Sequence, residues 1–177
     1  MKKSVDILLG YLKSNPDVGL VGPRLLNFDG NPQNSCFRFY TPTTILYRRT
    51  FLGKFGFSKK KINQFLLKGK NLDKPLEVDW IMGSALMTSR KAVEKVGLMD
   101  DNFFIFYFED VDWCRRFWEN GLKVVYYPYA KMYHYHGKGS ASMNPLKAMF
   151  LNKLAREHIK SGLKYFWKYL GKPNPHQ

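Results

Sequence analysis

Three carboxylates stand close together in a chain that is otherwise short of acids. Glu109, Asp110 and Asp112 follow the aromatic stretch 103–108, whereas the whole chain has 14 Asp and Glu residues against 29 Lys and Arg residues. A carboxylate that points into a cleft can take the proton from a reacting hydroxyl, which is general-base chemistry. Carboxylates in the first turn of a helix are also favoured by its dipole, so a structural role is the competing interpretation.

The spacing of these acids gives them different directions. Neighbouring side chains on a helix point about 100° apart, so Glu109 and Asp110 cannot both face one spot. Asp112 lies four residues before Arg116, and this spacing favours an ion pair along the helix surface. One of Glu109 and Asp110 is therefore left to face a cleft.

Two histidines form a second group with possible chemistry. His134 and His136 are two residues apart, beside a loop rich in glycine and serine. Alternate residues of a strand share one face, so both rings could bind the same metal ion. Two histidines do not complete a metal site, and ordinary surface or core histidines are the commoner case.

Several other chemistries lack their sequence motifs. Gly137-Lys138 is followed by glycine, not by Ser or Thr, so it is not a phosphate-binding P-loop. The sequence has no G-x-S-x-G nucleophile elbow, no Cys-x-x-Cys pairs for zinc and no Rossmann glycine fingerprint.

The composition indicates a globular protein with an anionic partner. Apolar residues make up 45% of the 177 residues, and the formal net charge is +15. This charge suits nucleic acid, an anionic membrane surface or a phosphorylated substrate. No recognised nucleic-acid-binding motif is present, so we expect no nucleic-acid partner. Cys36 and Cys114 are far apart, which favours reduced thiols and a cytoplasmic setting.

Two basic segments flank the part of the chain that carries the acids. Residues 44–70 contain Lys and Arg but no acid, within a region, 44–75, that we interpret as a basic insertion. Residues 144–177 carry an expected basic amphipathic helix over 145–170, followed by a tail. Each segment either covers the core or meets lipid head groups, and the first could also meet a diphosphate.

Alternating helices and strands must position the candidate residues. Gly83 and Ser84 lie inside an apolar run that predicts a buried strand, and glycine there often marks close approach of a ligand or another backbone. The acids lie at the start of an expected helix that ends at Asn120-Gly121. We expect helices at 5–12, 90–96, 108–119 and 145–170, and strands at 18–21, 36–40, 78–88, 122–127 and 132–136.

The order of motifs resembles that of a known family. The segment 79–85 (DWIMGSA) is followed by 97–104 (GLMDDNFF), by 108–116 (FEDVDWCRR), and then by Pro128 and His134. This order resembles the family 2 glycosyltransferases, in particular the rhamnosyltransferase-like branch that builds bacterial cell-surface polysaccharide. The resemblance covers about residues 5 to 170, and its most specific part runs from Trp80 to Arg116.

The resemblance implies a fold and a reaction. The expected fold class is α/β: a partial GT-A fold, Rossmann-like, with a mixed sheet, flanking helices and the C-terminal basic helix. The expected reaction is sugar transfer, with inversion, from a nucleotide-sugar donor to a lipid-linked or polysaccharide acceptor, assisted by a divalent cation (Mg²⁺ or Mn²⁺). An enzyme of this kind would work as a peripheral protein on the inner face of the cell membrane.

The resemblance also implies roles for individual residues. Asp110 corresponds to the general base, and Glu109 supports the acceptor site. His134 is the expected metal ligand, with His136 as second choice. The expected substrate-binding residues are Trp80, Gly83, Ser84 and Arg116.

One part of the family pattern is missing. The family begins with a nucleotide-binding half that ends in a D-x-D metal motif, and no D-x-D precedes the first expected helix. We therefore expect residues 1–143 to form the acceptor-side part of the domain and to be inactive alone. A separate donor-binding chain or a homo-oligomer would complete the enzyme. The alternative function is a non-enzymatic basic module that binds membrane surfaces.

Overall fold

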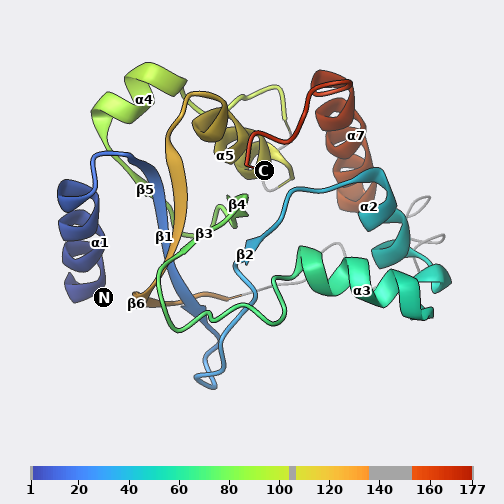
Figure 1. Cartoon of the computed structure of the whole chain (residues 1–177), viewed down its shortest axis with the longest axis horizontal. Coiled ribbons are helices and arrows are strands. Elements are labelled where there is room, and N and C mark those ends of the chain that lie inside the picture. The colour runs from blue at the N-terminus through green and yellow to red at the C-terminus, as the bar shows by residue number, and fades with distance from the viewer. Residues whose placement is uncertain (1, 104–106, 136–152, 177) are drawn as a thin grey trace.

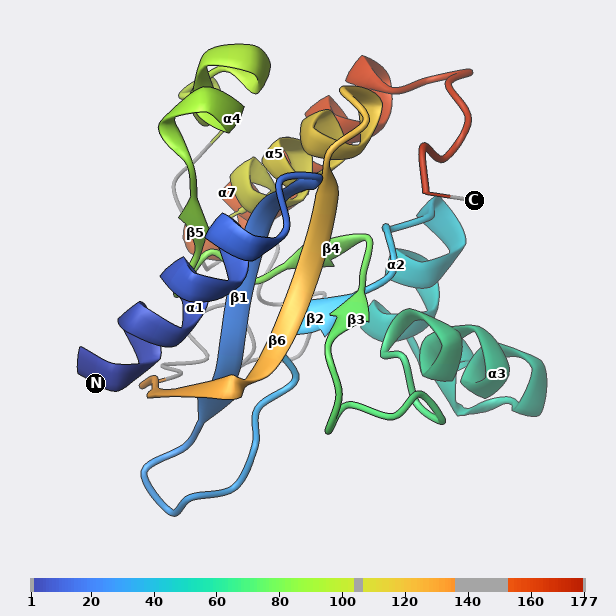
Figure 2. The same cartoon turned by 60° about the vertical axis from the view of Figure 1, so that its left-hand side comes forward.

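A computed structural model of the chain describes residues 2–103, 107–135 and 153–176. The fold is α/β, with a mixed sheet between flanking helices (Figures 1 and 2). The helices are α1 (Lys2–Ser14), α2 (Pro42–Arg49), the 3₁₀ turn η1 (Phe51–Lys54), α3 (Gly56–Phe65), α4 (Arg90–Val96), α5 (Glu109–Glu119) and α7 (Lys153–Lys168). The strands are β1 (Val18–Leu26), β2 (Cys36–Phe37), β3 (Leu76–Glu77), β4 (Trp80–Ile81), β5 (Met87–Thr88) and β6 (Lys123–Tyr133).

The main sheet has the strand order β3-β6-β1-β5. Its two long central strands, β1 and β6, are parallel, and the short strands β5 and β3 pair antiparallel on either side of them. Strands β2 and β4 form a separate antiparallel pair. The mixed α/β fold expected from the sequence is confirmed.

Both central strands run further than the sequence predicts. We expected β1 to stop at Gly22-Pro23 and two separate strands at 122–127 and 132–136. Instead, β1 continues to Leu26, and β6 runs as one strand through Pro128 to Tyr133. Pro23 pairs with Tyr127, and the register then shifts so that Arg24 pairs with Lys131. Proline cannot donate to the ladder, and a bulge at this point allows both strands to continue past their prolines.

The strand expected over 78–88 is divided in two. Strand β4 pairs with β2, strand β5 pairs with β1, and residues 82–86 turn between them. This interruption places Gly83 and Ser84 on the surface and not inside a buried strand. The glycine in the apolar run therefore marks a turn that faces α5.

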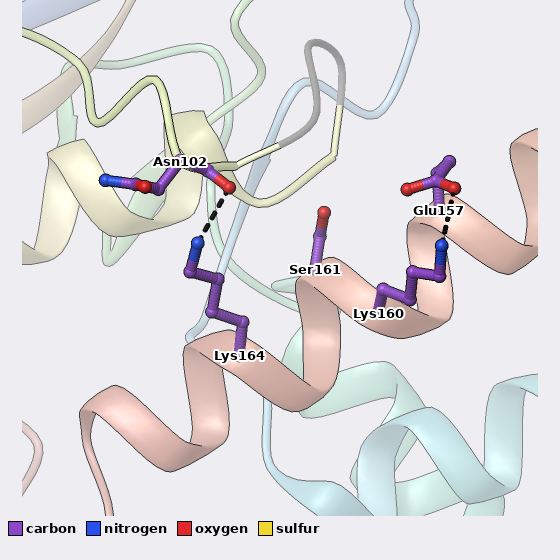
Figure 3. Close-up of a pocket in the computed structure, with 5 residues that line it drawn as sticks. All are labelled: Asn102, Glu157, Lys160, Ser161 and Lys164. Carbon is purple, nitrogen blue, oxygen red and sulfur yellow. Dashed lines mark hydrogen bonds and ion pairs between the residues drawn. The ribbon is translucent and has the colours of Figure 1, made fainter.

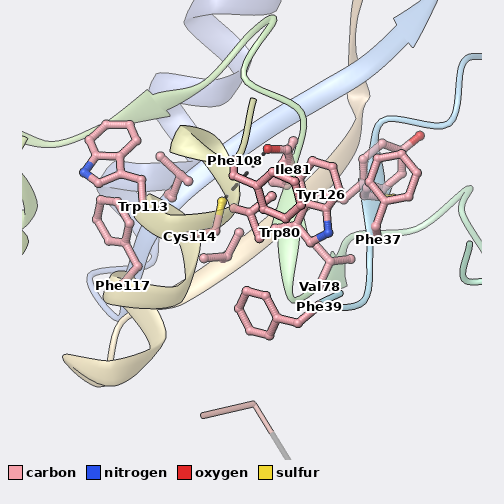
Figure 4. Close-up of a cluster of buried hydrophobic side chains, with 14 of the residues drawn as sticks. Phe37, Phe39, Val78, Trp80, Ile81, Phe108, Trp113, Cys114, Phe117 and Tyr126 are labelled. Carbon is pink, nitrogen blue, oxygen red and sulfur yellow. Dashed lines mark hydrogen bonds between the residues drawn. The ribbon is translucent and has the colours of Figure 1, made fainter. Parts of the chain in front are cut away.

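The core lies on both faces of the central strands. Successive strand residues alternate between the two faces, so Leu20 and Val124 join a large aromatic cluster while Val21 and Val125 pack beneath α1. Figure 4 shows the aromatic cluster, in which Cys114 of α5 lies beside Ile81 of β4. Burial of each large aromatic side chain contributes roughly 1.5–3 kcal/mol, so this cluster fixes α5 against the sheet.

The two basic segments are largely helical. The expected insertion 44–75 contains most of α2 together with η1 and α3, and it is anchored by Phe65, which stacks on Phe37. The helix expected over 145–170 is observed as α7, while residues 136–152 lie outside the part that the structure describes. Among the described helices, none combines the length and apolar character needed to cross a bilayer.

Candidate active site

The start of α5 is fixed by a residue in an unusual conformation. Phe108, which precedes the helix, has φ 72° and ψ −6°, a left-handed conformation that costs a non-glycine residue about 1–2 kcal/mol. Its buried ring packs against Tyr40 and Tyr165, with ring centroids 5.1 and 5.4 Å away. This packing holds the conformation, which in turn sets the direction in which Glu109 and Asp110 leave the loop.

Asp110 contacts the turn between β4 and β5. The Gly83 N–H donates to Asp110 Oδ2 at 2.9 Å, and the Val111 N–H donates to Oδ1 at 2.8 Å. A Cβ atom on Gly83 would lie 3.3 Å from the Asp110 Cβ, which is tighter than an ordinary contact. The structure therefore brings together two residues, 27 positions apart, that the sequence had singled out separately.

The surroundings of Asp110 make its carboxyl a base near neutral pH. Burial raises the pKa of Asp110, and the adjacent Glu109 carboxylate raises it further. The hydrogen bonds from Gly83 and Val111 act in the opposite direction, and the resulting pKa is about 7. A carboxyl that titrates near the working pH is suited to accept a proton from a substrate.

The other expected residues of this region differ in their access to a substrate. Ser84 is exposed next to Gly83, and Glu109 is half-buried beside Asp110. Trp80, by contrast, is only 5% exposed, and its indole N–H donates to the Arg38 carbonyl oxygen at 2.8 Å. This burial argues against direct contact between Trp80 and a sugar, so we assign Trp80 to the packing behind the site.

The expected ion pair between Asp112 and Arg116 is confirmed. Arg116 Nε lies 2.8 Å from Asp112 Oδ2, and the two Nη atoms donate to the carbonyl oxygens of Val96 and Leu98 at 2.9 and 2.7 Å. The guanidinium therefore ties α5 to the end of α4. The substrate-binding role given to Arg116 stays a prediction.

Asp112 has further partners that the sequence did not reveal. Its carboxylate is fully buried, and Oδ1 accepts from the Tyr169 hydroxyl at 2.7 Å and lies 2.7 Å from Lys168 Nζ. We call Asp112, Arg116, Lys168 and Tyr169 the Asp112 cluster. Because it joins the C-terminal part of the chain to α5, it holds the helix that carries Asp110. The partners are 56 and 57 residues away, so local spacing could not indicate them.

The C-terminal tail forms a second set of contacts that sequence reasoning missed. The His176 ring stacks on Trp118 with centroids 3.8 Å apart, and its Nδ1 lies 2.8 Å from Asp79 Oδ1. The same buried Asp79 carboxylate pairs with Arg38 at 2.8 Å. The tail thereby closes over the start of the 79–85 motif.

The candidate metal ligands are only partly described. His134 Nδ1 lies 3.0 Å from Gln33 Oε1, at the end of β6, and His136 lies outside the described residues. In the described part of the chain, no three or more His, Cys, Asp or Glu side chains are grouped so that they could hold a metal ion. These residues do not by themselves supply a site for Mg²⁺ or Mn²⁺, so the metal roles of His134 and His136 stay predictions.

A pocket of about 310 Å³ lies along α7, beside Asn102 (Figure 3). Lys164 Nζ donates to the Asn102 carbonyl oxygen at 2.8 Å, and Lys160 pairs with Glu157 at 2.9 Å. The lining residues are Asn102, Glu157, Lys160, Ser161 and Lys164. The two lysines give the pocket a cationic rim.

Comparison with known proteins identifies the family. The profile described as "Glycosyl transferase family group 2" matches residues 33–166, so the chain belongs to this family. The matched region includes Gly83 and the helix α5 that carries Asp110, and it ends within α7.

Individual relatives are rhamnosyltransferases. The chain is 31% identical over 145 residues to the N-acetylglucosaminyl-diphospho-decaprenol L-rhamnosyltransferase of Mycobacterium tuberculosis (strains CDC 1551 and H37Rv), covering 80% of this chain and 45% of the relative. It is 28% identical over 165 residues to Rhamnosyltransferase WbbL of Escherichia coli K12, covering 85% of this chain and 59% of the relative. The chain thus spans about half the length of the curated relatives it matches.

Proposed function

We propose that this chain supplies the acceptor side of an inverting glycosyltransferase in cell-surface glycan synthesis. The observation that carries the proposal is the carboxyl of Asp110, which has a pKa of about 7 and is held by the N–H of Gly83. Family membership supports the reaction class, and the packing around Phe108 supports a fixed position for the base.

The proposed chemistry begins at the acceptor hydroxyl. The Asp110 carboxylate takes the hydroxyl proton while the oxygen forms a bond to the anomeric carbon of the donor sugar. The bond from that carbon to the nucleotide diphosphate breaks, and the diphosphate leaves with the electron pair, so the configuration inverts. A positioned general base typically contributes roughly 10²- to 10⁴-fold to the rate.

The acceptor and donor follow from the relatives' names. One relative is named for rhamnosyl transfer to N-acetylglucosaminyl-diphospho-decaprenol, which is a lipid-linked diphosphate. We therefore propose a lipid-linked acceptor and test nucleotide-activated L-rhamnose first as the donor. A polysaccharide acceptor is the second choice. A divalent cation would steady the leaving diphosphate when bound.

The proposal also includes partners and a location. A donor-binding chain or a second copy of this chain would cooperate with the acceptor side, at the cytoplasmic face of the cell membrane. The competing proposal is a non-enzymatic module that binds membranes. The two proposals differ in one outcome, since only the first requires Asp110 for sugar transfer.

A transfer assay tests the proposal. The chain is assayed alone and joined to the portion of the Mycobacterium tuberculosis relative that lies outside the match, with labelled nucleotide-activated rhamnose and lipid-linked N-acetylglucosamine. We expect label in the lipid fraction from at least the joined protein, and a loss of about 10²-fold or more in Asp110→Asn. The proposal fails if the relative transfers sugar under these conditions but neither preparation does. It also fails if Asp110→Asn transfers at the unaltered rate.

A further inference from the structure

Helix α7 has apolar side chains on two opposite faces. Its inner face is anchored by Tyr165, which is 1% exposed and packs against Phe108. Ile159, Leu163 and Trp167 recur every four residues on the outer face and are 44%, 66% and 80% exposed, and Leu170 extends this line past the helix end at 74%. We call Ile159, Leu163, Trp167 and Leu170 the outer stripe. The inner face of α7 already packs into the core. The outer stripe can therefore contact a surface that does not belong to the described part of the chain.

The charge around the outer stripe is strongly positive. Lys153, Lys160 and Lys164 are exposed along the same helix, and Lys172 follows it. Within the described part of α7, the acid is Glu157, and Lys160 pairs with it at 2.9 Å. A helix with a basic surface and exposed Leu and Trp side chains has the composition of segments that lie in the head-group region of a membrane.

We propose that the outer stripe of α7 docks on the surface of an anionic lipid bilayer, with the helix in the plane of the head groups. Charge complementarity decides between lipid and a second copy of the chain. Two copies meeting through this face would bring their lysines together, on chains that each carry a net charge of +15. Anionic head groups neutralise those lysines while the interface accommodates Leu163 and Trp167.

The docking would place the candidate active site close to lipid. The inner face of α7 packs against Phe108, two residues before Asp110, and the adjoining Lys168 and Tyr169 bind Asp112 of the same helix α5. The helix that rests on the membrane is thus the helix that supports the base. The relevance of this position to catalysis rests on the proposed sugar transfer to a lipid-linked acceptor. The docking itself is inferred only from the exposed apolar side chains and the lysines of α7.

Vesicle co-sedimentation of the full 177-residue chain tests the docking. The vesicles are phosphatidylcholine alone or phosphatidylcholine with phosphatidylglycerol, at low and high salt. The test variant is Leu163→Glu with Trp167→Glu. The matched control is Val5→Glu with Leu9→Glu, because these residues are also four apart and exposed, on α1 at the opposite end of the molecule (Figure 1). Circular dichroism checks that both variants keep the helical content of the unaltered chain.

We expect salt-sensitive binding to the anionic vesicles, weakened at least about tenfold by the α7 variant and little by the α1 control. Absence of binding to anionic vesicles at low salt would overturn the proposal. Equal weakening by both variants would also overturn it, as it would show non-specific attachment. A change from dimer to monomer in the α7 variant, with unaltered vesicle binding, would assign the stripe to a second copy instead. Sugar transfer is not measured, so failure here leaves the function proposal standing.

Discussion

The carboxyl of Asp110 acquires its base character from three neighbours that act in different directions. Burial and Glu109 favour the protonated form, while the N–H groups of Gly83 and Val111 favour the carboxylate. The left-handed conformation of Phe108 sets this arrangement, because it aims the first turn of α5 at the Gly83 turn. The carboxyl of Asp110 thus has a pKa suited to accepting a proton, and its orientation is fixed by the turn at Gly83.

The contribution of Glu109 to this pKa can be measured directly. Replacing Glu109 by Gln removes the repulsion that raises the pKa of Asp110, so we expect that pKa to fall from about 7. The measurement is an NMR titration of the Asp110 carboxyl carbon in the chain. Glu119→Gln, at the far end of α5, is the control and should leave the titration midpoint of Asp110 unchanged. An unchanged midpoint in Glu109→Gln would show that Glu109 does not contribute to the pKa of Asp110.

The same pKa predicts how stability depends on pH. The folded-state pKa of about 7 is above the ordinary value of 3.8, so folding favours the protonated carboxyl. The stability that this preference contributes is fully present below about pH 4 and is lost as the pH rises through about 7. The contribution of Asp100 to stability has the opposite pH dependence. Lys168 lowers the pKa of Asp100 to about 2, so this contribution is lost as the pH falls through about 2.

At the scale of elements, α5 is held between the end of α4 and the C-terminal part of the chain by one buried carboxylate. Asp112 accepts hydrogen bonds from Arg116 and Tyr169 and pairs with Lys168, while Arg116 also reaches the carbonyl oxygens that follow α4. The position of Asp110 on α5 therefore depends on segments that are distant in the sequence.

Loss of the buried carboxylate should be costly. Asp112→Ala leaves the Lys168 and Arg116 charges without their buried partner, and we expect a loss of about 3–5 kcal/mol in the free energy of unfolding. Glu157→Ala breaks a more exposed ion pair, the one between Glu157 and Lys160 on α7, and should cost less than about 1 kcal/mol. Urea denaturation of both variants measures the difference. Equal costs would mean that the Asp112 cluster does not anchor α5.

The contact between α7 and Phe108 can be tested through a glycine. A Cβ atom at Gly162 would lie 3.2 Å from the Phe108 ring, whereas one at Gly10 in α1 meets nothing within 4 Å. We expect Gly162→Val to lower the free energy of unfolding by about 1–3 kcal/mol, because it overpacks the ring that holds α5. Gly10→Val is the matched control and should be close to neutral. A neutral Gly162→Val would show that the Phe108 ring can move without cost.

Local patterns predicted much of this arrangement, and long-range contacts account for the rest. The spacing of Asp112 and Arg116 predicted their ion pair, and the helix expected at 90–96 is observed as α4, which is capped by Ser89 and Gly97. The length of the central strands was not predicted, because a bulge in β6 lets both strands continue past Pro23 and Pro128. No local sequence pattern predicts the contact of Tyr169 with Asp112 or that of His176 with Asp79. Both contacts form only because the C-terminal part of the chain folds back onto the domain.

At the scale of the whole molecule, the chain belongs to the family group 2 glycosyl transferases and spans about half the length of its curated relatives. Its described part contains a candidate base but no grouped metal ligands. In the proposed function, this chain would orient the acceptor and deprotonate it through Asp110. The net charge of +15 and the outer stripe of α7 are consistent with work at an anionic surface.

The pH dependence of sugar transfer tests the central claim most directly, in whichever preparation transfers sugar. With Asp110 as the base, we expect kcat/KM to fall as the pH drops below about 7 and this limb to move to lower pH in Glu109→Gln. In Asp110→Asn, kcat/KM should be about 10²- to 10⁴-fold lower at every pH, and it should no longer fall as the pH drops below about 7. A variant lacking the Asp110 carboxyl that keeps both the rate and the pH limb would contradict the assignment of the base.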